Sequence, residues 1–123
     1  MEIARLEIPY KFPSFNEYVD ECRKNRYAGA KMKKQIQQDI GYFINTLPVF
    51  ENPVIINFTW VEGNRKRDYD NICYAKKFIL DALVQCGKLS DDNRKIVTAF
   101  RDDFTEGNEW KVILEIYERE GEL

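Results

Sequence analysis

The sequence contains no histidine, and this absence removes the side chain that most often serves as a general base or a zinc ligand. Any chemistry must therefore rest on carboxylates, amines, hydroxyls or thiols. Cysteine is scarce as well: Cys22, Cys73 and Cys86 lie far apart, and none belongs to a Cys-x-x-Cys pair. We expect these cysteines to be reduced thiols that pack as small hydrophobic side chains.

Long apolar runs are also missing. No stretch approaches the ~20 apolar residues that a membrane span needs, and the first residues, MEIARLEIPYKF, show no apolar core behind a basic start. We therefore expect a cytoplasmic protein without a membrane partner. The chain has 123 residues, of which 44% are hydrophobic and 14% aromatic. This composition predicts one domain over residues 1–123, with a core that needs neither disulfides nor a structural metal.

The charge is unevenly distributed. A net charge of −2 by itself argues against a nucleic-acid partner. However, residues 23–34 include no acid, and a second basic cluster follows at residues 65–67. Because an anionic polymer responds to local charge, we predict that these two segments bind DNA, the alternative being a solvated face. The predicted DNA-binding residues of the two segments are Arg23, Lys24, Arg26, Lys31, Lys33, Lys34, Arg65, Lys66 and Arg67.

The hydrophobic periodicity predicts an α+β fold. Strands are expected at residues 3–8, 54–62, 95–101 and 110–117. A first helix is expected after the capping box of Ser14 and Glu17, a second at residues 30–47, and a third at residues 71–86 before Gly87. The element order β-α-α-β-α-β-β predicts a single domain in which one mixed sheet of about four strands packs against helices. The order of the strands in the sheet cannot be derived from the sequence.

Two pairs of acids are candidates for metal binding. Asp68 and Asp70 are two residues apart where a strand leads into a helix, and in extended backbone such positions point to the same side. Two converging carboxylates suit Mg²⁺ or Mn²⁺. For Asp70, capping of the helix is an equally open alternative. Asp91 and Asp92 follow the helix, and because adjacent side chains point apart we expect only one of them to enter the site. A polar turn is the alternative there.

Two lysines on the third predicted helix are candidates for contacting DNA. At about 100° per residue, Lys77 returns to within roughly 20° of Asp70 on the side opposite the core face. Its long side chain leans toward the start of the helix and is expected to reach a phosphate there. An ordinary surface lysine is the open alternative. Lys76 is expected about 120° from Asp70, as a solvated or DNA-contacting lysine.

The run from residue 67 to residue 92 resembles one known family. It contains Arg67-Asp68-Tyr69-Asp70-Asn71, then Leu80-Asp81-Ala82-Leu83, Gly87 and Asp91-Asp92. This combination resembles the RusA-type Holliday junction resolvases, which are RusA-like endodeoxyribonucleases of phages and prophages. The strand before Arg65 and the Ile8-Pro9 pair match the family loosely. One departure is that the segment between Asn71 and Lys77 is longer by roughly three residues, nearly one helical turn.

The resemblance implies a function and a set of site residues. It implies that Asp68, Asp70 and Asp92 bind catalytic Mg²⁺ or Mn²⁺, and that Lys77 is the catalytic lysine, with Lys76 as a competitor. It also implies a homodimer that resolves Holliday junctions, four-way branched DNA, by paired nicking during recombination and repair. The rival interpretations are a non-catalytic DNA-structure-binding phage protein, a nucleotide phosphotransfer enzyme and a structural adaptor. A nucleotide phosphotransfer enzyme should contain a Gly-rich phosphate loop, which this sequence lacks.

Overall fold

Four strands form one mixed sheet in this computed structural model, which describes residues 2–119. They are β1 (Glu2–Ile8), β2 (Val54–Glu62), β3 (Val97–Glu106) and β4 (Lys111–Glu118), in the spatial order β1-β4-β2-β3. β4 pairs antiparallel with both β1 and β2, whereas β2 and β3 are parallel. A parallel pair needs a crossover connection, and the helical segment between β2 and β3 provides it.

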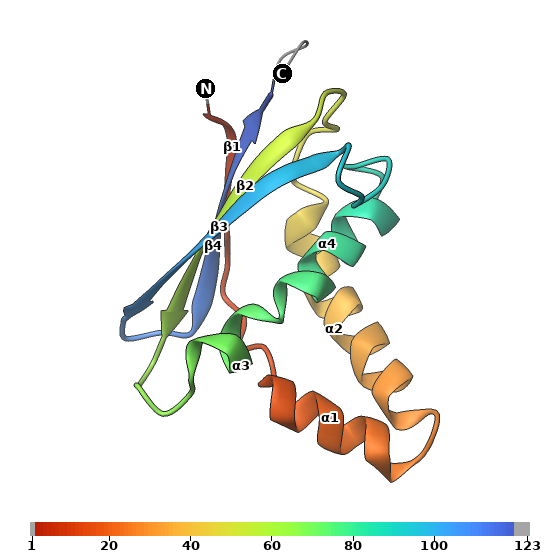
Figure 1. The fold of residues 1–123 in the computed structure, drawn as a ribbon, viewed down its shortest axis with the longest axis vertical. Helices are drawn as coiled ribbons and strands as arrows, with labels where there is room; N and C mark the ends of the chain where they lie inside the picture. Colours follow the sequence, from red (N-terminus) through yellow and green to blue (C-terminus); the bar gives the residue numbers. More distant parts are fainter. Residues whose placement is uncertain (1, 120–123) are drawn as a thin grey trace.

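The helices lie on one face of the sheet (Figure 1). They are α1 (Phe15–Lys24), α2 (Ala28–Ile44), α3 (Tyr69–Cys73) and α4 (Lys76–Gln85). The predicted capping box is confirmed, because Ser14 Oγ accepts from the Glu17 amide at 3.1 Å and Glu17 Oε1 accepts from the Ser14 amide at 3.0 Å. Beyond α4, Gly87 has φ of 73°, the left-handed conformation expected of the residue that ends this helix. The predicted α+β fold with one mixed sheet is therefore confirmed.

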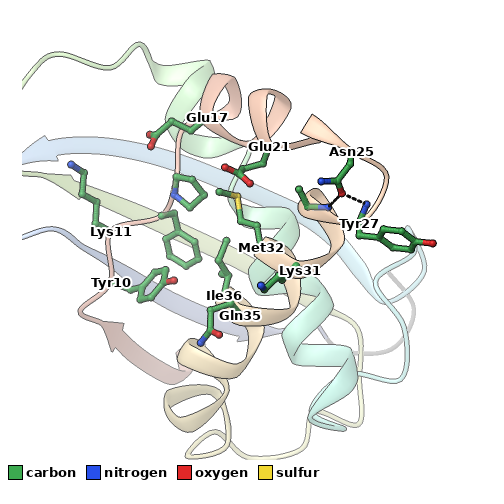
Figure 2. A pocket seen from close by; sticks show the side chains of 13 residues that line it. Tyr10, Lys11, Glu17, Glu21, Asn25, Tyr27, Lys31, Met32, Gln35 and Ile36 are labelled. Atoms are coloured by element: carbon green, nitrogen blue, oxygen red, sulfur yellow. Dashed lines mark hydrogen bonds between the residues drawn. The ribbon is translucent and has the colours of Figure 1, made fainter. Parts of the chain in front are cut away.

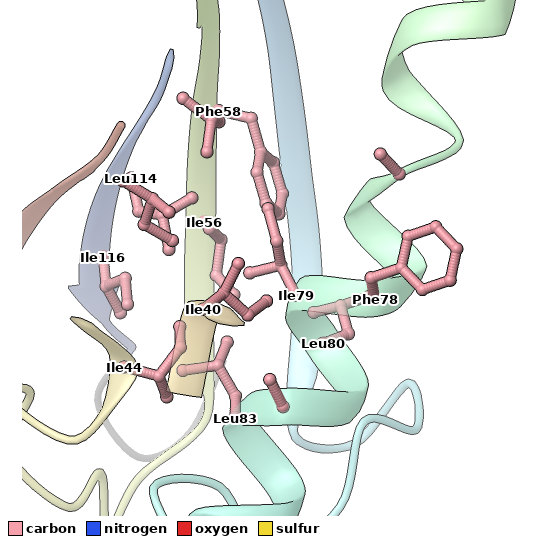
Figure 3. Packing of buried hydrophobic residues seen from close by; sticks show 14 of the residues in the cluster. Ile40, Ile44, Ile56, Phe58, Phe78, Ile79, Leu80, Leu83, Leu114 and Ile116 are labelled. Carbon is pink, nitrogen blue, oxygen red and sulfur yellow. The ribbon is translucent and has the colours of Figure 1, made fainter. Parts of the chain in front are cut away.

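The core lies between the sheet and the helices. Along β2 every second residue is buried, as the alternation predicted for this strand requires. Figure 3 shows the side chains of β2 and β4 facing those of α2 and α4. The facing residues include Ile56, Phe58, Leu114 and Ile116 from the strands and Ile40, Ile44, Ile79 and Leu83 from the helices. This continuous core fixes how the crossover segment lies against the sheet.

The predicted single helix over residues 71–86 is interrupted. α3 ends at Cys73 and α4 begins at Lys76. Between them the Ala75 amide bonds to the Ile72 carbonyl at 3.3 Å, and the Phe78 amide bonds to the Ala75 carbonyl at 3.0 Å. This three-residue spacing is tighter than that of an α-helix, so the regular step of about 100° per residue, on which the angle predicted between Asp70 and Lys77 depended, is interrupted between them. The interruption falls within the segment that is longer than the family pattern.

The predicted boundaries of β3 are wrong. The strand begins at Val97 and continues to Glu106, past the predicted end at residue 101. β3 lies at the edge of the sheet and is mostly exposed, so it lacks the apolar alternation on which the prediction depended. Within residues 2–119, no helix is long and apolar enough to cross a membrane.

Candidate functional site

The motif of residues 67–71 is fastened to the fold at both ends. Arg67 donates from Nε and Nη2 to the two carboxylate oxygens of Glu62, at 2.8 and 2.9 Å, and from Nη1 to the Phe12 carbonyl at 2.7 Å. At the other end, Asn71 Oδ1 accepts from the Asn16 amide at 3.2 Å. The Arg67 side chain is only 14% exposed, because it is enclosed with its partner Glu62. The prediction that Arg67 contacts DNA is therefore not supported by its position.

The two acids inside this motif, Asp68 and Asp70, have exposed side chains. Asp68 occupies the N-cap position of α3, yet its side chain makes no capping hydrogen bond. Asp70 accepts a hydrogen bond only from the adjacent Asn71 amide, at 3.0 Å. Both side chains are exposed, and in the described part of the chain neither forms an ion pair. Asp68 therefore does not cap α3 through its side chain, whereas Asp70 lies in the first turn of α3, where its charge also suits the helix dipole.

Asp68 and Asp70 line one cavity of about 680 Å³ between the motif and the end of β3. Glu62 and Glu106 line it as well, but each has a cationic partner: Arg67 pairs with Glu62, and Arg65 makes a close ion pair with Glu106. The uncompensated negative charge of this cavity therefore comes from Asp68 and Asp70. Such a site attracts a cation.

Asp92 and Lys77 meet, although 15 residues separate them in the sequence. Lys77 Nζ lies 3.1 Å from Asp92 Oδ2 and 3.0 Å from Asp81 Oδ1, and Lys33 Nζ lies 2.8 Å from Asp81 Oδ2. The hydrogen bond to Asp81, followed by that to Asp92, raises the pKa of Lys77 above its ordinary value. Burial pushes the pKa of Asp81 upward, but the two ammonium groups outweigh it and the pKa is lowered.

Asp91 and Asp92 have different hydrogen-bond partners. Asp91 Oδ1 accepts from the Asp92 amide at 2.7 Å and its Oδ2 accepts from Asn93 Nδ2 at 3.1 Å, so its side chain stabilises the turn. Asp92 is instead turned toward Lys77. The two acids therefore have different surroundings.

That Asp68, Asp70 and Asp92 bind one metal ion stays a prediction. Among the residues that the structure describes, no group of three or more acids or cysteines could hold a metal ion. Asp68 and Asp70 do fit Mg²⁺ as a pair, because this ion keeps several waters and is often held by one or two carboxylates together with substrate phosphates. The donor chemistry fits an open site of two aspartates, and Asp92, which pairs with Lys77, stays the third predicted ligand.

Lys76 is not the solvated lysine that was predicted. Its side chain is 14% exposed, it makes a close ion pair with Asp102, and its ammonium lies 4.1 Å from the centre of the Phe100 ring. Asp102 also accepts from Trp60 Nε1 at 2.8 Å. Lys76 is the first residue of α4, and its side chain lies against β3, which contributes both Asp102 and Phe100. Asp102 was missed by the sequence prediction, since an acid in an exposed edge strand gives no signal of its own.

The basic segment of residues 23–34 is compensated in three dimensions. Lys24 pairs with Glu21, and Lys33 pairs with Asp81. Lys31 lines a cavity of about 960 Å³ between α1 and α2 together with Glu17 and Glu21 (Figure 2). In sequence these lysines are far from most of the acids that they meet. Among the described residues, the members of this segment that form no ion pair are Arg23, Arg26, Lys31 and Lys34. In the second cluster, Lys66 is exposed.

Comparison with known proteins does not identify the chain. No protein-family model matches it, and no curated protein matches it. The resemblance of residues 67–92 to the RusA-type enzymes consequently stays an expectation that only experiment can test.

Proposed function

We propose that the protein is a metal-dependent endodeoxyribonuclease that resolves four-way DNA junctions. The observation that carries the proposal is the state of the motif 67–71. Its outer residues are fastened by hydrogen bonds, while Asp68 and Asp70 stay free and exposed in one cavity. Exposed carboxylates held on an anchored backbone are suited to binding a cation.

Asp68 and Asp70 would bind Mg²⁺ or Mn²⁺ and place it at the mouth of the cavity. When bound, such an ion provides a hydroxide nucleophile at neutral pH and stabilises charge on a phosphate. Lys77 carries a fixed positive charge, because Asp81 and Asp92 hold its ammonium at 3.0 and 3.1 Å. Because the two carboxylates offset this charge, Lys77 would stabilise a phosphate only where its ammonium turns from Asp92 toward that phosphate. With no histidine in the sequence, these side chains are the available means of activating water.

The partners are proposed as four-way or branched DNA and a second copy of the chain. A homodimer would present two sites to opposite strands of a junction, which permits paired nicking. Exposed basic residues outside the acidic cavity, among them Lys34 and Lys66, would contact the phosphates. Sedimentation of the free protein and of its junction complex would test the dimer.

A non-catalytic DNA-structure-binding protein is the second candidate. The observation that favours it is the separation of Asp92, which pairs with Lys77, from a closed group of metal ligands. Such a protein would keep its junction affinity whether or not a divalent ion is present.

Incubation with a labelled synthetic four-way junction separates the two candidates. We expect symmetric nicks near the branch point with Mg²⁺ or Mn²⁺, and none with a chelator. Junction binding without cleavage in either metal would instead establish the non-catalytic protein. A protein that neither binds nor cleaves the junction would overturn both candidates.

A further inference from the structure

Tyr69 is an exposed aromatic side chain at the centre of the motif 67–71. Its ring stacks on Phe104 of β3, with ring centres 4.1 Å apart and planes inclined by 7°. Although Phe104 covers one face of the ring, the residue remains 65% exposed. The opposite face of the tyrosine ring is therefore open to solvent.

The ring is held in place from several directions. Phe104 belongs to β3 and lies beside Trp60 of β2 in the parallel register, so it is part of the sheet. Arg67 and Asn71, two residues before and after Tyr69, are fastened by the hydrogen bonds described above. An aromatic ring fixed in this way loses little conformational entropy when a second flat group stacks on it.

The position of Tyr69 differs from that of the other exposed aromatic residues. The Arg26 guanidinium lies 5.0 Å from the centre of the Tyr27 ring, and Lys76 lies over the Phe100 ring. By contrast, Tyr69 and Phe104 line the cavity that contains Asp68 and Asp70. Tyr69 and the carboxylates of the proposed metal site therefore line the same cavity.

We propose that Tyr69, backed by Phe104, is a stacking platform for one unpaired nucleobase of branched DNA. The inference rests on the proposed function and adds the part of the substrate that binds beside the metal site. A nucleobase is the occupant that fits, because every base has a π-face that stacks on an aromatic ring irrespective of sequence. The phosphate attached to it meets the cation that Asp68 and Asp70 bind, and the exposed cations Arg65 and Lys66 lie in the same loop. The stacked rings suit a base, and the bound cation would offset the negative charge of the cavity toward the attached phosphate.

The test uses a synthetic four-way junction that carries 2-aminopurine at the branch point, with Ca²⁺ replacing Mg²⁺ during binding. Affinity and 2-aminopurine fluorescence are measured for wild type, Tyr69→Ala, Tyr69→Phe and Tyr42→Ala. Tyr42 is the matched control, because it is also a highly exposed tyrosine but lies on α2, outside the cavity. Thermal unfolding of each variant confirms that it is folded.

We expect Tyr69→Ala to weaken junction binding by about 5- to 150-fold, the range for loss of one base–aromatic stack. The fluorescence change on binding should disappear as well. Tyr69→Phe keeps the ring and Tyr42→Ala leaves the cavity intact, so both should bind within about two-fold of wild type. Phe104→Leu retains Tyr69 but removes its support, and a partial loss of affinity is expected.

Two results overturn the platform. The first is wild-type affinity in folded Tyr69→Ala. The second is a loss of affinity that is the same for fully paired duplex DNA as for the junction and that leaves the fluorescence change intact. Cleavage in Mg²⁺ is measured separately on the same samples. If the junction is cleaved but its affinity does not depend on Tyr69, the platform is overturned and the nuclease is not. Tyr69-dependent binding without any cleavage supports the platform and overturns the nuclease. A wild-type protein that binds no branched DNA overturns both.

Discussion

At the scale of single residues, Asp70 is the most direct probe of the proposed metal site. We expect Asp70→Asn to lower cleavage by orders of magnitude, because a neutral amide replaces one of the two charges that hold the ion. Junction binding should persist or strengthen, since repulsion between the carboxylate and phosphate is relieved. Cleavage and binding assays on the same preparation measure both effects. Asp20→Asn, an exposed acid on α1, is the control, and full cleavage by Asp70→Asn would remove Asp70 from the site.

The two acids of the pair 91–92 should differ in their effect on activity. Asp92 contacts Lys77, whereas Asp91 is used in the turn. We therefore expect Asp92→Asn to reduce cleavage far more than Asp91→Asn. Single-turnover cleavage rates of the two variants measure the difference. Equal rates would show that the contact with Lys77 has no part in the reaction.

Arg67 should act on stability and not on DNA affinity directly. Replacing it with Met leaves Glu62 buried without its cation, and breaking a buried ion pair in this way costs roughly 3–5 kcal/mol of unfolding free energy. Lys66→Met changes an exposed neighbour and should cost less than about 0.5 kcal/mol. Urea unfolding measures both. A small effect of Arg67→Met would mean that its three hydrogen bonds do not hold the motif in place.

At the scale of whole elements, local signals explain what the sequence predicted. Ser14 with Glu17 marks the start of α1, Gly87 marks the end of α4, and the alternation in β2 marks its buried face. Each of these features depends on neighbouring residues only. The break at Tyr74 and Ala75 carries no proline or glycine, so nothing in the sequence distinguishes it from continuous helix. The orientations predicted for the lysines of α4 assumed a continuous helix, and Lys76 is instead enclosed with Asp102.

In the candidate site too, features that depend on neighbouring residues were predictable and contacts between distant residues were not. Spacing selected Asp68 and Asp70, which line one cavity, and adjacency suggested that Asp91 and Asp92 have different surroundings, but that these acids bind a metal ion stays a prediction. The burial of Arg67 and Lys76 was not predictable, because their partners Glu62 and Asp102 come from other elements. Pairing across the sheet and the crossover depends on strand order, which the sequence does not reveal.

The basic face of α2 should contribute to DNA binding through its free lysines only. We expect Lys31→Gln with Lys34→Gln to weaken junction binding and to reduce the slope of log K against log salt by about 0.9 for each phosphate that is no longer neutralised. Lys33→Gln should leave the slope nearly unchanged and instead lower stability, because Lys33 is bound to Asp81. Titrations at several salt concentrations distinguish the two sets. An unchanged slope in the double variant would show that these lysines are solvated and do not contact DNA phosphates.

At the scale of the whole molecule, two carboxylates link stability to pH. The ammonium of Lys111, with the guanidinium of Arg5, lowers the pKa of Glu7 below its ordinary value of 4.5. The two lysines around Asp81 outweigh its burial and lower its pKa below 3.8. A carboxyl group whose pKa is lower in the folded state stabilises the fold at pH values above its ordinary pKa. That contribution is lost as the pH falls through the lowered pKa.

Acid should therefore destabilise the fold partly through Asp81, which joins α4 to α2 through Lys33. We expect Asp81→Asn to cost roughly 1.5–3 kcal/mol at neutral pH, the range for hydrogen bonds to charged groups. Protonation removes the same charge from the wild type, so the difference between the two proteins should shrink as the pH falls below the ordinary value of 3.8. Urea unfolding at a series of pH values measures this difference, with Asp20→Asn as the exposed control. A difference that stays constant down to the lowest pH would mean that Asp81 stabilises the fold by packing and not by its charge.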